Sequence, residues 1–168
     1  MYYLAYGSNL HPQRLSLRVP NCRLVGTTIL SGYRLTFNKR STDGSSKCHL
    51  DFTGNPEHVA HAVVYEVPQN EIRTLDYAEG LGSGYFKEQI TVTINDEPFL
   101  SFVYLASQSH ITATLEPYHW YKGFVLAGAG RHQFPVEYVQ QIAAVVSMPD
   151  HNGTRRAEME TLLALLEA

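Results

Sequence analysis

The stretch Tyr2–Leu10 reads YYLAYGSNL and joins an apolar run directly to a turn at the start of the chain. Aromatic and aliphatic residues over Tyr2–Tyr6 are typical of a strand, and Gly7-Ser8-Asn9 are residues typical of turns. The ends of a chain are usually its least ordered parts. A strand and a turn placed here therefore predict a turn that is held firmly and has a functional role.

Beyond this turn, the pattern predicts strands first and helices last. The expected strands are Cys22–Leu30, Tyr33–Asn38, His49–Thr53, Val59–Val67, Glu88–Ile94 and Phe99–Ala106. The expected helices are His11–Leu17, Pro68–Ala78, Pro117–Gly130, Pro135–Val146 and Thr154–Glu167. This order predicts an α+β fold, with helices docked on one part of an antiparallel or mixed sheet. We expect residues 1–168 to form a single domain.

Three finer expectations concern connections and packing. Ser31-Gly32 should join two strands in a tight hairpin. The polar segment KRSTDGSSK, Lys39–Lys47, should be a mobile surface loop. The last helix places apolar residues on one face, which should pack on the sheet; a homodimer through this face is the alternative, and it is not predicted. That face consists of Met159, Leu162, Leu163 and Leu166.

Charge and cysteine content exclude several classes of protein. The net charge is −3 and no basic run is longer than two residues, which argues against nucleic acid or an anionic membrane as a partner. No apolar stretch approaches the roughly 20 residues that a membrane span needs. The two cysteines, Cys22 and Cys48, do not form a disulfide framework. With no signal peptide expected, these features predict a cytoplasmic protein.

Common catalytic motifs are also missing. His58 and His61 are three residues apart on a predicted strand, which would send their rings to opposite faces. The sequence contains neither an HExxH nor a GxSxG motif, and its glycine-rich turns do not match GxGxxG. We therefore expect no metal site, no nucleotide site and no cofactor.

Two turns remain as candidates for chemistry. Gly7 allows backbone N–H groups to approach a ligand, and Ser8 or Asn9 can cap the following helix, where N–H groups favour an anion. Glu79 precedes a glycine-rich turn amid Tyr77, Leu81 and Tyr85, a setting poor in positive charge. A carboxylate in an apolar pocket can act as a base that later returns the proton. Taken singly, each turn is better explained without a ligand: the first as an ordinary strand–turn–helix corner and the second as a loop with a solvated glutamate.

Three motifs in order narrow this choice. YLAYGSNL, LDYAEGLGSGYFKEQITV and WYKGFVLAGAGRHQFPVEYVQQI together resemble the γ-glutamylcyclotransferase family, including its avirulence-induced-gene-like branch. The resemblance covers Tyr2 to about Val146. Asn9 argues against the glutathione-specific branch, whose loop is of a Y-G-S-L type. The matching positions outside the first motif are Leu75, Asp76, Glu79, Gly80, Gly84, Tyr85, Tyr121, Val125, Gly128, Ala129, Phe134, Pro135, Tyr138 and Ile142.

The resemblance implies a γ-glutamylcyclotransferase-like fold, a small mixed β-barrel-like sheet with flanking helices. It implies an acyltransferase or lyase type of enzyme that cyclises a small γ-glutamyl substrate to 5-oxoproline, through attack by the substrate's own α-amine. Glu79 would be the catalytic acid and base, and no cofactor would be needed. The implied substrate-binding residues are Tyr6, Gly7, Ser8, Asn9, Leu10, Tyr85 and Tyr121.

Two alternatives stay open at the sequence level. The fold could serve as a non-catalytic small-molecule-binding or interaction module, although the presence of Glu79 and of the loop favours an enzyme. Within catalysis, the substrate could be a γ-glutamylamine instead of a γ-glutamyl amino acid. The sequence does not fix the leaving amine, because that side of the substrate would face Lys39–Lys47 and Ser107–Glu116.

Overall fold

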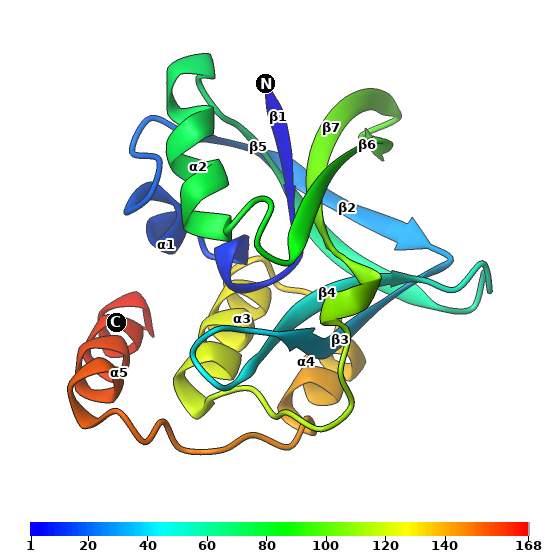
Figure 1. Cartoon of the computed structure of the whole chain (residues 1–168). Coiled ribbons are helices and arrows are strands. Elements are labelled where there is room, and N and C mark those ends of the chain that lie inside the picture. The colour runs from blue at the N-terminus through cyan, green and yellow to red at the C-terminus, as the bar shows by residue number, and fades with distance from the viewer. Residues whose placement is uncertain (168) are drawn as a thin grey trace.

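The strands of the computed structural model, which describes residues 1–167, form a five-stranded sheet and a separate two-stranded one (Figure 1). The five-stranded sheet has the order β2-β5-β1-β7-β6, and the smaller sheet pairs β3 with β4. β1 runs parallel to β7 and the other neighbours are antiparallel, so the larger sheet is mixed. The strands are β1 (Tyr2–Ala5), β2 (Arg23–Ser31), β3 (Tyr33–Arg40), β4 (Ser46–Phe52), β5 (Val59–Glu66), β6 (Tyr85–Ile94) and β7 (Glu97–Ala106).

Helices gather on one side of the strands in Figure 1. Each of the five predicted helical segments is helical in the structure, with ends shifted by a few residues. The α-helices are α1 (Pro12–Ser16), α2 (Ile72–Glu79), α3 (His119–Arg131), α4 (Val136–Ala143) and α5 (Gly153–Glu167). The short 3-10 helices are η1 (Ser8–Leu10), η2 (Gln69–Glu71) and η3 (Gln108–His110). No helix in the described chain is long and apolar enough to cross a membrane.

β1 is the middle strand of the larger sheet, and its Leu4 and Ala5 have no exposed surface. The two edge strands of this sheet approach each other: the Thr28 hydroxyl of β2 donates to the Thr93 carbonyl of β6 at 2.9 Å. The sheet is therefore strongly curled, which agrees with the expected mixed, barrel-like sheet with flanking helices. The turn after β1 consequently starts from the centre of the fold.

The predicted hairpin at Ser31-Gly32 is wrong. β2 pairs with β5 and β3 pairs with β4, so the two segments belong to different sheets. Gly32 has a φ of 82° and forms a corner where the chain leaves one sheet and enters the other. Its N–H donates to the His58 carbonyl and its carbonyl accepts from the Thr53 N–H, both at 2.8 Å. A turn signal specifies a change of direction, whereas the pairing depends on distant strands.

The predicted surface loop Lys39–Lys47 is also wrong at both ends. Its first two residues belong to β3 and its last two to β4. Ser45 and Ser46 have no exposed surface, and Lys39 is only 6% exposed. The Ser46 N–H donates to the Glu116 carbonyl at 2.9 Å, which ties this polar segment to the chain before α3.

The last helix packs on another helix. Leu163 of α5 lies directly over Gly123 of α3, so α5 covers α3, and the expected packing on the sheet is not what is seen. The segment before α5 is anchored by Asp150, which accepts from Trp120 Nε1 at 3.0 Å and from Arg155 Nε at 2.6 Å. One buried carboxylate thus joins α3 to α5.

Candidate active site

Close packing on two sides fixes the turn after β1. A Cβ atom at Gly7 would lie 3.0 Å from Cys48 Cβ on β4, so only glycine lets the turn approach this strand so closely. On the other side, a Cβ at Gly128 of α3 would lie 2.5 Å from Leu10 Cβ. The turn is therefore clamped between β4 and α3, as the opening motif predicted.

The backbone of this turn has unused donors. The Leu10 N–H donates to the Gly7 carbonyl at 3.0 Å. Within residues 1–167, the N–H groups of Gly7, Ser8 and Asn9 have no hydrogen-bond acceptor. We call residues 7–9 the cradle. Consecutive free N–H groups form a partial positive charge that suits a carboxylate or an oxyanion.

Glu79 is the last residue of α2, where the helix is fixed in two ways. Gly80 takes the left-handed conformation that ends the helix, with a φ of 70°, and the Leu81 N–H donates back to the Asp76 carbonyl at 2.9 Å. The Asp76 side chain accepts from the Tyr104 hydroxyl at 2.5 Å and pairs with Lys87 Nζ at 2.6 Å. These contacts hold the end of α2 against β6 and β7.

Glu79 meets the cradle through Asn9 and Arg18. Glu79 Oε1 accepts a hydrogen bond from Asn9 Nδ2 at 2.8 Å and a second one from the Arg18 guanidinium. The same guanidinium donates to Asn9 Oδ1 at 3.0 Å, which closes a ring of three side chains. Glu79 Oε2 accepts no hydrogen bond from the described residues, so one carboxylate oxygen is free to accept a proton.

The expected surroundings of Glu79 are corrected by this arrangement. The sequence predicted a setting poor in positive charge, yet Arg18 forms an ion pair with Glu79. Tyr77 is 90% exposed and Leu81 is exposed as well, so neither encloses the carboxylate. No pattern in the sequence pointed to Arg18, which lies in the turn just after α1 ends at Ser16.

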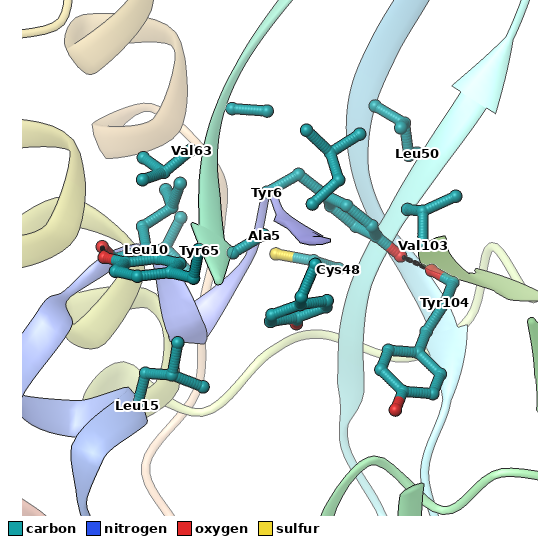
Figure 2. Close-up of a cluster of buried hydrophobic side chains, with 14 of the residues drawn as sticks. Ala5, Tyr6, Leu10, Leu15, Cys48, Leu50, Val63, Tyr65, Val103 and Tyr104 are labelled. Atoms are coloured by element: carbon teal, nitrogen blue, oxygen red, sulfur yellow. Dashed lines mark hydrogen bonds between the residues drawn. The ribbon is translucent and has the colours of Figure 1, made fainter. Parts of the chain in front are cut away.

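A pocket of about 290 Å³, its mouth included, lies between the cradle and Glu79. It brings together seven of the eight residues proposed for catalysis and binding. The exception is Leu10, a core residue whose carbonyl accepts from the Tyr65 hydroxyl at 2.6 Å; both lie away from Tyr104 in Figure 2. The lining consists of Tyr3, Tyr6, Gly7, Ser8, Asn9, Cys48, Glu79, Tyr85, Tyr104 and Tyr121.

The predicted tyrosines serve chiefly as walls. The Tyr6 hydroxyl donates to the Tyr104 carbonyl at 2.5 Å (Figure 2), and the Tyr85 hydroxyl donates to the Cys48 carbonyl at 2.6 Å. The Tyr121 oxygen accepts from the Cys48 N–H at 3.0 Å. Burial raises the pKa of Tyr6, Tyr85 and Tyr121 well above the ordinary value, so these phenols stay neutral. They therefore present aromatic surface to whatever enters.

Sequence reasoning missed three other lining residues. Tyr3 accepts from Asn9 Nδ2 at 3.1 Å, and Tyr104 lies on the interior strand β7. Burial raises the pKa of Cys48 to about 12, which makes it a neutral thiol and a poor nucleophile. In the part of the chain that the structure describes, no three potential metal ligands gather.

The chain and its fold are similar to those of known proteins. The model of the AIG2-like family matches residues 59–142, which is half of the chain. The chain is similar to a Bos taurus protein named gamma-glutamylcyclotransferase, with 25% identity over 169 residues, covering 99% of this chain and 89% of the bovine protein. The Homo sapiens protein of the same name is 25% identical over 165 residues, covering 96% and 86%. A solved structure of a gamma-glutamyl cyclotransferase superposes with a TM-score of 0.82 at 24% identity, covering 98% of both chains.

Proposed function

Because this chain belongs to the AIG2-like family, we propose that it is a γ-glutamylcyclotransferase, which converts the γ-glutamyl group of a small substrate to 5-oxoproline and releases an amino acid or amine. The relatives that carry this name support the activity. The observation that carries the proposal is the hydrogen bond of 2.8 Å between Asn9 Nδ2 and Glu79 Oε1. It places a carboxylate beside three free backbone donors.

The cradle suits the anionic parts of a γ-glutamyl group. Its free N–H groups would bind the α-carboxylate and the negative charge that develops on the γ-carbonyl oxygen. Donors that are fixed in place before reaction need no reorganisation, and the clamp of Gly7 against Cys48 provides that fixation. The tyrosine walls would exclude water, which strengthens these interactions.

The reaction itself is intramolecular. The α-amine of the substrate attacks its own γ-carbonyl carbon, so that a new C–N bond closes a five-membered ring and the bond to the leaving nitrogen breaks. Because the nucleophile is already in the substrate, orientation alone can contribute about 7–11 kcal/mol to lowering the barrier. The pocket would supply this orientation by folding the γ-glutamyl chain.

Glu79 would carry the proton. Its free oxygen, Oε2, accepts a proton from the α-ammonium, and the same carboxyl donates it to the leaving nitrogen as the C–N bond breaks. The carboxylate then takes the second proton that the attacking nitrogen must lose to become the ring N–H and passes it to the departing amine, which leaves as an ammonium, so charge and protons balance. Asn9 and Arg18 hold the other oxygen and thereby aim Oε2. Arg18 would also stabilise the carboxylate whenever it is ionised.

The decisive test is Glu79→Gln, which keeps the size of the side chain and removes the base. General acid–base catalysis contributes about 10²–10⁴-fold per step, and Glu79 would serve two steps, so turnover should fall at least about a thousandfold. Stability should fall by about 1 kcal/mol, because Arg18 loses its ion pair. The measurements are 5-oxoproline release, the thermal midpoint and calorimetric binding of a γ-glutamyl amino acid.

Glu71→Gln is the matched control. Glu71 lies in η2, just before α2, and bonds to Asn21 outside the pocket, so this variant should keep full turnover. If Glu79→Gln retains more than about a tenth of the wild-type rate, the base lies elsewhere and the proposal fails. If the wild type binds γ-glutamyl compounds and releases 5-oxoproline from none of them, the protein is a binding module.

A further inference from the structure

Lys39 contacts the turn that follows Glu79, residues 80–84, which we call the Glu79 turn, and it lies close to the pocket. It is near the end of β3, and a Cβ at Gly84 would lie 2.9 Å from its Cε. Its Nζ lies 4.4 Å from the centre of the Tyr85 ring, which is itself a wall of the pocket. Lys39 forms an isolated antiparallel bridge with Ile111. The two segments expected to face the leaving amine, Lys39–Lys47 and Ser107–Glu116, therefore meet at Lys39.

The ammonium of Lys39 has no partner among residues 1–167. The residue is only 6% exposed, and its Nζ forms neither a hydrogen bond nor an ion pair with them. A second lysine of this region, the half-buried Lys47, has partners: its Nζ pairs with Asp43 at 2.7 Å and bonds to the Ser45 hydroxyl at 2.8 Å. An ammonium without a counter-ion is free to bind an anion, and a charge-assisted hydrogen bond to a carboxylate would stabilise it.

The Lys39 ammonium also interacts electrostatically with the Glu79 carboxylate. Burial lowers the pKa of Lys39, while the carboxylates of Glu79 and Asp43 act in the opposite direction. The ammonium is therefore within electrostatic reach of the residue that would protonate the leaving nitrogen. Any substituent on that nitrogen starts beside Glu79, and Gly84 is the point where the Glu79 turn touches Lys39.

We propose that Lys39 is a specificity-determining residue that binds a carboxylate on the leaving group. On this assignment, the protein distinguishes a departing amino acid from a departing amine by the ammonium of one lysine. The assignment rests on the proposed function, and it concerns a different part of the substrate from the cradle.

Two substrates that differ only in this carboxylate test the assignment: γ-glutamyl-alanine and γ-glutamyl-alaninamide. A charge-assisted hydrogen bond should give the wild type a preference of about 10- to 100-fold in kcat/KM for the acid. In Lys39→Met, this ratio should fall toward one, mainly through the KM for the acid. Lys39→Arg keeps the charge and should retain part of the preference.

Lys122→Met is the control lysine. The Lys122 ammonium bonds to the Ala143 and Val145 carbonyls at the end of α4, outside the pocket lining, so the ratio should stay at its wild-type value. An unchanged kcat/KM ratio in Lys39→Met would overturn the assignment, even if both substrates were turned over more slowly. The thermal midpoint of Lys39→Met should hold or rise, because the ammonium has no counter-ion to lose and methionine is apolar.

Failure of this assignment is separable from failure of the proposed function. If the wild type turns over neither substrate, the assignment is tested by calorimetric binding of γ-glutamyl-alanine and γ-glutamyl-alaninamide. A preference for the acid that disappears in Lys39→Met supports the assignment without catalysis. Equal binding of both compounds, or binding of neither, overturns it.

Discussion

Asn9 connects the two halves of the site because an amide both donates and accepts. Its Nδ2 donates to Glu79 and to Tyr3, and its Oδ1 accepts from Arg18. An aspartate here would repel Glu79, and an aliphatic residue would leave both the carboxylate and the guanidinium short of a partner. The asparagine of the opening motif thus positions the carboxylate as well as lining the pocket.

Gly7 can be tested by adding a side chain. In Gly7→Val, the new Cβ meets Cys48 Cβ at 3.0 Å and the Tyr121 oxygen at 3.5 Å, so the cradle must move. We expect a loss of about 1–3 kcal/mol in the free energy of unfolding and at least about tenfold weaker binding of γ-glutamyl-alanine. Denaturant melts and calorimetry measure the two quantities. Unaltered binding by a folded Gly7→Val protein would mean that the cradle has no role in recognition.

At the scale of single residues, motif and spacing predicted the cradle, Glu79 and the aromatic walls Tyr6, Tyr85 and Tyr121. They did not predict Arg18, because it lies in the turn after the five-residue helix α1, where no periodicity indicates which way a side chain points. Tyr104 was missed for a related reason. A tyrosine on an interior strand can fill the core or face a pocket, and the sequence pattern is the same in both cases.

At the scale of elements, α3 acts as the support of the cradle, and two of its glycines form a matched pair for a test. A Cβ at Gly128 would lie 2.5 Å from Leu10 Cβ and 2.8 Å from the His11 nitrogen, whereas a Cβ at Gly130 has nothing within 4 Å. Gly128→Ala should therefore displace the cradle, lower stability by about 1–3 kcal/mol and reduce turnover.

Gly130→Ala adds the same methyl group to the same helix in open space. It should raise stability by up to about 1 kcal/mol, because alanine loses less entropy than glycine in a helix, and it should keep turnover. Thermal melts and 5-oxoproline release measure both variants. If the two variants behave alike, α3 does not support the cradle through Gly128.

The predicted strands and helices were largely right, but the predicted pairing of the second and third strands was wrong. Alternation of apolar residues reports whether a segment is a strand, and that information is local. Which strand lies beside it is decided by long-range packing, so β2 and β3 were placed in one hairpin although each pairs elsewhere. The burial of Ser45 and Ser46 was hidden for the same reason, since their cover comes from the chain before α3.

At the scale of the whole molecule, Asp150 holds the C-terminal helix to the rest of the fold. Its buried carboxylate accepts from Trp120 of α3 and binds the Arg155 guanidinium through both oxygens, at 2.6 and 2.7 Å. Asp150→Asn removes the charge of this pair. We expect it to lower the free energy of unfolding by about 2–4 kcal/mol near neutral pH.

The same contact predicts a pH dependence. Hydrogen bonds from Arg155 hold the pKa of the Asp150 carboxyl far below its usual range. As the pH falls below the ordinary aspartate value of about 3.9, the unfolded chain takes up the proton first, so the native state loses this stabilisation. The difference between wild type and Asp150→Asn should thus shrink between about pH 5 and about pH 2.

Asp51→Asn is the comparison variant for this measurement. Asp51 pairs with Arg34 at 2.7 Å in an exposed position, and such pairs contribute about 0–1 kcal/mol. Urea melts across this pH range measure both variants. A constant difference between wild type and Asp150→Asn at all pH values would mean that the Arg155 pair is not what stabilises α5.

The central position of β1 also has a consequence in time. β1 lies between β5 and β7, and its parallel partner, which pairs Tyr2 with Ser101, follows it by more than half of the chain. During synthesis on a ribosome at about 5–20 residues per second, this apolar strand waits about 5–20 s before both of its neighbours exist. Until β7 has been made, one edge of this hydrophobic strand therefore stays unpaired, and that is the interval in which chaperones would meet it.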